Sequence, residues 1–111
     1  GRSGLYNLQF SAQLYNTAVQ EHDSSIWIRK NGTDITNSNS SFSIASSHGG
    51  TAGHVIAALN IYVDLDIDDY VEIMWSATST AVSLQFLPTE VSPVRPAVPS
   101  IIATLTFVSD A

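Results

Sequence analysis

Four aspartates cluster between residues 64 and 69, where the apolar pattern of the chain is interrupted. They are Asp64, Asp66, Asp68 and Asp69. Alternating carboxylates at the end of a strand can converge on a hard cation, and Ca²⁺ takes about six to eight oxygen ligands. The segment lacks the glycine and the distal bidentate glutamate of an EF-hand loop, and aspartate is a common turn residue in its own right. Two interpretations therefore stay open, a calcium site and a plain turn, and the turn is favoured.

Two histidines bracket a glycine-rich segment, His48-Gly49-Gly50-Thr51-Ala52-Gly53-His54. Two imidazoles at this spacing can bind zinc if the segment folds back, but a zinc site uses about four ligands and the spacing supplies no third. The glycines also lack the following Lys-Ser/Thr pair and the helix that a phosphate-binding loop requires. A solvated loop is therefore the favoured interpretation.

The sequence contains no recognisable motif for a hydrolytic active site. His22 stands between Glu21 and Asp23, and serines are numerous, but no Gly-x-Ser-x-Gly segment orients one particular serine. Trp27 and Trp75 could stack on sugar rings, although each falls in an alternating segment, which favours packing in a core or between subunits. We therefore predict that the protein is not an enzyme.

Composition restricts the partners. The chain has 111 residues and a formal net charge of −6, and its four cations are scattered along it: Arg2, Arg29, Lys30 and Arg95. A protein that neutralises phosphates needs a basic face, so nucleic acid and membranes are not expected partners. No apolar run approaches the ~20 residues of a membrane-spanning helix. The absence of cysteine excludes disulfides, thiolate metal sites and thiol nucleophiles.

Strict alternation of apolar and polar residues predicts the elements that position these side chains. From Tyr6 to Leu14 every second residue is apolar, which is typical of a half-buried strand. The segment 25–30 also alternates and runs into Asn31-Gly32, a strong hairpin signal because both turn residues must adopt positive φ. Further strands are predicted near 41–45 and over 55–65, 70–75, 81–86 and 101–108. Ala57 and Ala58 admit a helix over 55–59, but the β-branched and aromatic residues that follow favour a strand.

The remaining segments predict loops within a single domain. Residues 37–53 are rich in Ser, Asn and Gly, and residues 88–99 contain all four prolines, which leaves no place for a sheet interior. About eight strands without a convincing helix are typical of an all-β sandwich or jelly roll. We expect residues 1–111 to form one domain, and we expect the chain, which begins with Gly1, to be a C-terminal fragment of a longer protein.

Three segments in this order resemble one family of β-proteins. They are Ile26-Trp27-Ile28-Arg29-Lys30-Asn31-Gly32-Thr33, Leu65-Asp66-Ile67-Asp68-Asp69-Tyr70-Val71-Glu72-Ile73, and the closing strand with Ile101, Ala103, Leu105 and Phe107. The second is similar to the leucine–x–x–Gly–Asp–aromatic–Val element of C1q/TNF-like domains. Together they resemble the C1q/TNF-like jelly-roll modules of phage virion proteins, most strongly over 24–36 and 61–76. Asp68 stands where the family usually has glycine, and the aromatic-rich first motif of animal C1q domains is missing, which points to the viral branch.

The resemblance implies a homotrimer whose first and last strands line the three-fold axis. The residues implied in this trimer interface are Tyr6, Leu8, Phe10, Ile101, Ala103, Leu105 and Phe107. The resemblance also implies that Asp69 is a structural residue of its turn. A physical argument leads to the same assembly, because several strands are apolar on both sides and an exposed apolar patch of several hundred Å² normally marks an interface.

We therefore expect a structural protein of a phage virion, a trimeric surface module that decorates a capsid or tips a fibre and so stabilises the particle. Its partners would be copies of itself and other virion proteins, and its location would be the virion surface. No cofactor is predicted apart from the open calcium interpretation. The alternative is a knob of a tail fibre or spike that binds a host receptor or glycan through the loops at 15–25, 37–53 and 88–99.

Overall fold

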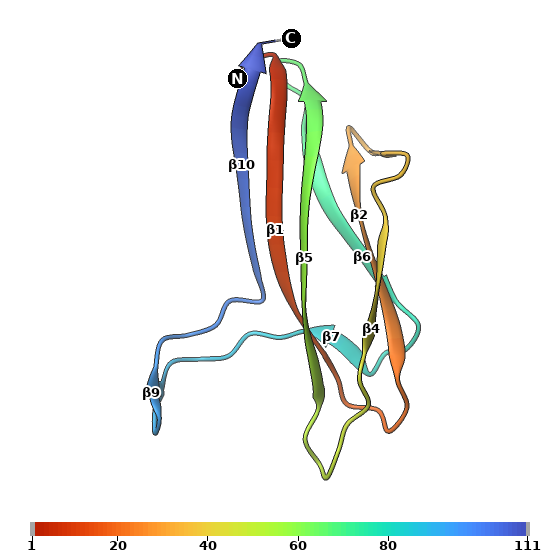
Figure 1. Cartoon of the computed structure of the whole chain (residues 1–111), viewed down its shortest axis with the longest axis vertical. Coiled ribbons are helices and arrows are strands. Elements are labelled where there is room, and N and C mark those ends of the chain that lie inside the picture. The colour runs from red at the N-terminus through yellow and green to blue at the C-terminus, as the bar shows by residue number, and fades with distance from the viewer. Residues whose placement is uncertain (1, 111) are drawn as a thin grey trace.

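The computed structural model describes residues 2–110 as strands joined by turns and loops (Figure 1). The strands are β1 (Gly4–Asn16), β2 (His22–Lys30), β3 (Thr33–Asp34), β4 (Ser40–Ile44), β5 (Gly53–Leu65), β6 (Val71–Ala77), β7 (Val82–Leu84), β8 (Glu90–Val91), β9 (Val94–Arg95) and β10 (Ile101–Asp110). No helix occurs in residues 2–110, and hence none that is long and apolar enough to cross a membrane. The prediction of an all-β protein is confirmed.

One sheet, which we call sheet A, is built around β1. On one side β5 pairs antiparallel with β1 along its whole length. On the other side β10 pairs with residues 4–12 of β1, and β7 pairs with residues 14–16. β7 and β10 therefore lie end to end along the same edge of β1. Residues 85–100 leave the sheet between them and carry the short hairpin β8–β9 (Figure 1).

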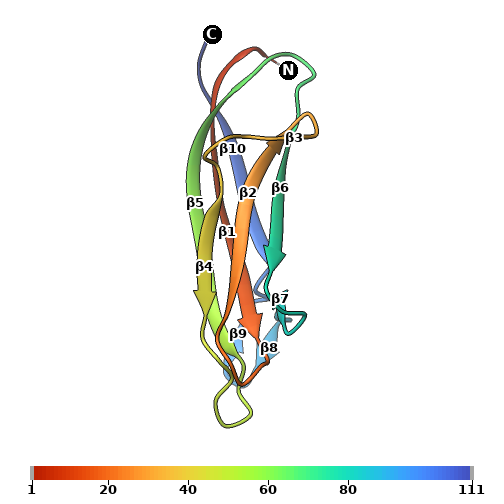
Figure 2. The ribbon, with the colours of Figure 1, turned by 90° about the vertical axis from the view of Figure 1, so that its right-hand side faces the viewer.

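The other sheet, sheet B, is built around β2. β6 pairs with residues 24–30 of β2 on one side, while β4 and β3 share the other side. The hairpin from β2 to β3 turns at Asn31 and Gly32, whose φ angles of 51° and 83° are the positive values that this dipeptide predicts. The two sheets face each other as in a β-sandwich, with sheet B in front in Figure 2.

The core lies between the sheets, where the apolar side of each alternating strand faces the other. Its buried residues are Leu8, Phe10, Ala12, Leu14, Ile26, Ile28, Ile44, Ala57 and Val82. Fully burying one leucine or isoleucine side chain stabilises a fold by about 1.5–3 kcal/mol. The period-two pattern of β1 and β2 thus supplies most of the interior, and the strand interpretation of 55–65 is confirmed by β5.

Two predicted segments differ from the structure. The strand expected over 81–86 ends at Leu84, and Phe86 lies exposed beyond it because the chain turns away from β1 there. The proline-rich segment 88–99 is not only a loop, since it contains the two-residue strands β8 and β9. These strands pair only with each other, so the prediction that the segment does not enter a sheet interior is confirmed.

The chain is more extended than a compact protein of its size. Its Cα radius of gyration is 16.4 Å, whereas about 13 Å is expected for this length. Its accessible surface is 6836 Å², against about 5,900 Å² for a compact monomer of the same mass. The projecting segment 85–100, which we call the arm, and the strand β10 beside it are the visible causes (Figure 1).

Candidate interaction surface

β10 forms because its sequence, IIATLTFVSD, is dominated by β-branched and aromatic residues, which suit a pleated strand. Its register with β1 sets the direction of each side chain. Leu105 lies opposite Leu8 and Ala103 opposite Phe10, so the odd-numbered positions 101–107 face the same side as the core residues of β1. Ile102, with the threonines at 104 and 106, faces the outer side.

The inward side of β10 is nevertheless uncovered. Ile101 is 38% exposed and Leu105 is 46% exposed, and Ala103 between them is also exposed. Sheet B covers β1 and β5 but leaves β10, to the left of β1 in Figure 1, without a facing strand. We call these three residues the β10 strip. Their side chains point to the inward side of sheet A, but no strand of sheet B covers them.

One end of β10 is anchored to the beginning of the chain. The rings of Tyr6 and Phe107 meet edge to face with centroids 5.4 Å apart, and the guanidinium of Arg2 lies 4.4 Å from the centre of the Phe107 ring. Arg2 also pairs with Asp110 at 2.9 Å. These contacts hold β10 against β1, so the β10 strip is presented on a fixed strand.

The residues predicted for the trimer interface thus divide into three groups. Leu8 and Phe10 are buried in the core of the single chain, because the second sheet covers β1. Their assignment to an interface is corrected by this burial. Tyr6 and Phe107 are half-buried against each other. The three residues of the β10 strip remain open to a partner.

The acidic segment folds as a turn closed by one carboxylate. The backbone N–H of Asp66 donates to Asp69 Oδ2 at 2.7 Å, and Asn31 Nδ2 donates to Asp69 Oδ1 at 2.8 Å. The first of these bonds lowers the pKa of Asp69 most, the second follows, and the nearby Lys30 ammonium adds to them. No group of three or more His, Asp or Glu side chains in residues 2–110 could hold a metal ion. The aspartates at 64, 66, 68 and 69 are therefore not brought together as calcium ligands.

The predicted histidine sites are also dispersed. His48 bonds through its backbone to Thr51 in a tight turn, whereas the ring of His54 stacks on Tyr15 of β1 with centroids 6.1 Å apart. At the start of β2, His22 Nδ1 lies 3.3 Å from the hydroxyl of Thr78. None of these three arrangements forms a metal-binding cluster within the described residues.

The two tryptophans occupy opposite sides of sheet B. Trp27 points outward, where its Nε1 donates to Asp34 Oδ1 at 2.9 Å beside a bond of 3.0 Å from Arg29. The bond from Arg29, followed by that from Trp27, lowers the pKa of Asp34. Trp75 lies opposite Ile26 on the inward side of β6 and is still 38% exposed. Trp27 therefore does not enter the core, and Trp75 reaches only its open margin.

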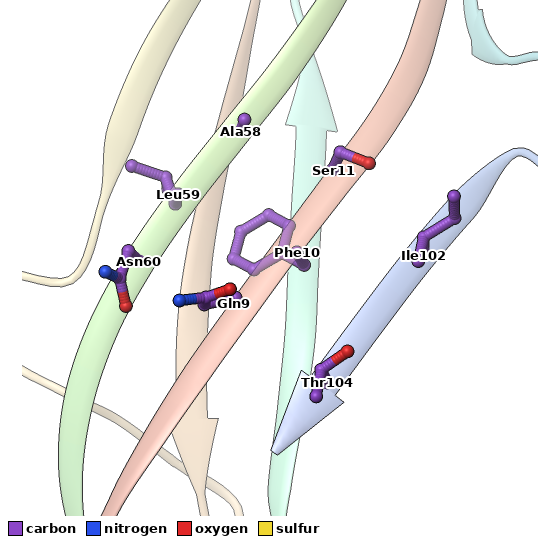
Figure 3. Close-up of a pocket in the computed structure, with 8 residues that line it drawn as sticks. All are labelled: Gln9, Phe10, Ser11, Ala58, Leu59, Asn60, Ile102 and Thr104. Atoms are coloured by element: carbon purple, nitrogen blue, oxygen red, sulfur yellow. The ribbon is translucent and has the colours of Figure 1, made fainter. Parts of the chain in front are cut away.

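Sequence reasoning missed a shallow hollow of about 420 Å³ on sheet A. It crosses β5, β1 and β10 (Figure 3) and is lined by Gln9, Phe10, Ser11, Ala58, Leu59, Asn60, Ile102 and Thr104. The small side chains of Ser11 and Ala58 lie opposite each other across the strands, which leaves the space. No ionisable side chain is among the residues that line the hollow.

Comparisons of the chain with protein-family models, curated proteins and solved structures find no match.

Proposed function

We propose that this chain is a self-associating structural module of a phage virion surface, a C1q/TNF-like jelly roll that forms a homotrimer through β10. The observation that carries the proposal is the exposure of the β10 strip. Leucine and isoleucine on the core side of a sheet are normally covered, and an open apolar strip on a rigid strand is stabilised when another surface removes it from water.

The amount of surplus surface fits one protein interface. The chain exposes 6836 Å², which is roughly 900 Å² more than a compact monomer of its mass. A standard interface buries about 800 Å² on each partner. The surplus of each chain is thus of the size that an interface with another copy buries on one partner.

The edge of β10 also lacks the usual protection against pairing. Natural edge strands carry lysine, proline or a short length that blocks association. β10 runs for ten residues with no proline and no lysine, and its first charged residue is Asp110 at the far end. Within residues 2–110 it pairs with β1 alone. An edge of this kind is suited to a permanent partner.

The placement on a virion rests on the resemblance, supported by the surface chemistry. A net charge of −6 with 25 serines and threonines gives an acidic, hydroxyl-rich exterior, which favours solubility and disfavours unspecific adhesion. The mechanism is then assembly: three copies bury their apolar strands, and the polar faces stay outside. Labelling of purified phage particles with an antibody against this chain tests the placement, and unlabelled particles would contradict it.

Light scattering on the purified chain tests the assembly. The expected mass is about three times the 11.9 kDa of one chain. Leu105→Lys places a charge in the β10 strip and should give a monomer with an unchanged β-type circular dichroism spectrum. Val19→Lys, in the exposed loop after β1, is the matched control and should stay trimeric. A wild-type monomer would overturn the proposal.

A further inference from the structure

Both ends of the arm are hydrogen-bonded to the same residue of β1, Gln13. The N–H of Gln85 donates to the carbonyl of Gln13 at 2.9 Å, and the N–H of Gln13 donates to the carbonyl of Ser100 at 2.8 Å. On either side of this point Leu14 lies opposite Leu84 and Ala12 opposite Ile101. The edge strand is therefore continuous in register across the arm, and the fold of the sheet does not require it.

The arm is braced by its own contacts. Leu87 and Val98 exchange two backbone hydrogen bonds of 2.9 and 2.7 Å, and Glu90 pairs with Arg95 at 2.7 Å. Arg95 Nη1 also donates to the carbonyl of Pro88 at 3.0 Å. An isolated two-stranded hairpin is marginally stable in water. These contacts within the arm therefore help to hold it in one conformation.

The tip of the arm is apolar and stands away from the sandwich. Val91 and Val94 are each 84% exposed, and the tip lies at the lower left of Figure 1, clear of both sheets. The pairing of Glu90 with Arg95 leaves the hairpin without a net charge from these two residues. The tip is thus suited to pack against an apolar surface, and that surface would belong to another molecule because the tip does not contact its own sandwich.

We propose that the arm is an exchanged clasp, whose tip packs Val91 and Val94 onto the β10 strip of a neighbouring copy of this chain. The proposal rests on the proposed function, since it names the contact that closes the trimer. From Gln85 to Val91 the arm reaches at most about 20 Å, which is also the length of β10 from Ile101 to Phe107. Because the arm emerges at the base of β10, a neighbour that covers β10 lies beside the arm.

Exchange of arms around a ring of copies covers both exposed surfaces, the tip of the arm and the β10 strip. Each protomer then contributes one arm and receives one arm, so the contact is heterologous and closes after three copies. The charge-neutral tip meets a strip without ionisable groups, Ile101, Ala103 and Leu105, and no charge is desolvated. Each protomer therefore makes two such contacts, one through its own tip and one through its own β10 strip.

Excision of the arm tests the proposal with little risk to the fold. In a variant that lacks residues 86–100, Gln85 is followed directly by Ile101, which preserves the pairing of residues 12–14 with their partners. The expected result is a folded chain whose trimer dissociates at a protein concentration at least ten-fold higher than that of the full chain. If the excised chain does not fold, the double variant Val91→Lys, Val94→Lys is measured in its place with the same expectation.

The outcomes separate the two proposals. A trimeric full chain whose dissociation is unaffected by either arm variant, while Leu105→Lys gives a monomer, overturns the clasp and leaves the proposed function intact. A monomeric full chain overturns both.

Cross-linking locates the contact, because the natural chain has no cysteine. A Val94→Cys chain is co-assembled with a tagged Leu105→Cys chain and oxidised in air, so that a disulfide joining tagged to untagged chains can form only between copies. We expect this species as the main product, and none when Val19→Cys replaces Val94→Cys. Equal yields in the two mixtures would overturn the assignment of the tip to the β10 strip.

Discussion

Two strands of sheet A, the inner strand β1 and the edge strand β10, show how differently the same alternating pattern can be used. Leu14 on β1 and Leu105 on β10 are the same residue type, both in alternating strands and both on the inward side of one sheet. Leu14 is fully buried, whereas Leu105 is 46% exposed. Alternation therefore determines the face of a side chain, but the opposing sheet determines whether that face is buried. The part of sheet A that sheet B covers, which we call the covered half, stabilises the single chain. The uncovered half, which is β10, is available for association.

The most direct test of this difference is to replace each of the two leucines by alanine. Leu14→Ala should lower the free energy of unfolding by about 3 kcal/mol, because a fully buried leucine leaves a cavity. Leu105→Ala, measured at a protein concentration at which the copies are dissociated, should lower the free energy of unfolding of the single chain by less than about 1 kcal/mol. Chemical denaturation followed by circular dichroism measures both values. Equal costs would show that β10 is covered within one chain.

The covered half also contains a buried polar centre. Asn16 is fully buried; its Nδ2 donates to the carbonyl of Gln20 at 2.8 Å, and its Oδ1 accepts from the N–H of Ala18 at 2.9 Å. Asn16→Ala removes these bonds and leaves backbone groups without partners, which should cost about 2 kcal/mol. Thr17→Ala, next along the chain and exposed, is the control and should cost under about 0.5 kcal/mol. A neutral Asn16→Ala would show that water replaces the lost bonds.

Much of the sandwich was predictable because its rules are local. The period of two gave the inward faces of β1 and β2, and Asn31-Gly32 gave the hairpin because few other dipeptides accept positive φ at both positions. The pairing of strands is not local. That β10 shares an edge of β1 with β7 depends on contacts between residues about 70 to 100 apart in sequence, and no short pattern encodes them.

The same limit explains the candidate site. The closing strand over 101–108 was correctly predicted as a strand. Leu8 and Phe10, however, were placed in the interface because burial by sheet B cannot be read from β1 alone. The arm was predicted as a proline-rich loop, and only the register on both sides of Gln13 shows that it is an insertion into a continuous edge.

A smaller effect is expected where β10 meets the beginning of the chain. Arg2→Ala removes the cation over the Phe107 ring and the exposed pair with Asp110. Since such exposed contacts contribute at most about 1 kcal/mol each, the global stability should change little, while amide hydrogen exchange at Ser109 should accelerate. Arg95→Ala, whose partners lie in the arm, should leave exchange at Ser109 unchanged. Acceleration in both variants would indicate general loosening rather than release of this end of β10.

The smallest effect concerns pH and the turn at the end of β5. Its hydrogen bonds hold the pKa of Asp69 below the ordinary value near 3.8 in the folded chain, so the unfolded chain binds more protons as the pH falls. The stabilisation by Asp69 should therefore be complete above about pH 4 and should be lost as the pH falls through the lower folded pKa. Asp69→Asn should melt at a lower temperature than the wild type at pH 7 and should lose less on acidification from pH 4 to pH 2. Asp68→Asn, at a turn position with positive φ that asparagine also accepts, should follow the wild-type acid profile. An Asp69→Asn profile parallel to that of the wild type over this interval would place the acid-sensitive group elsewhere in the chain.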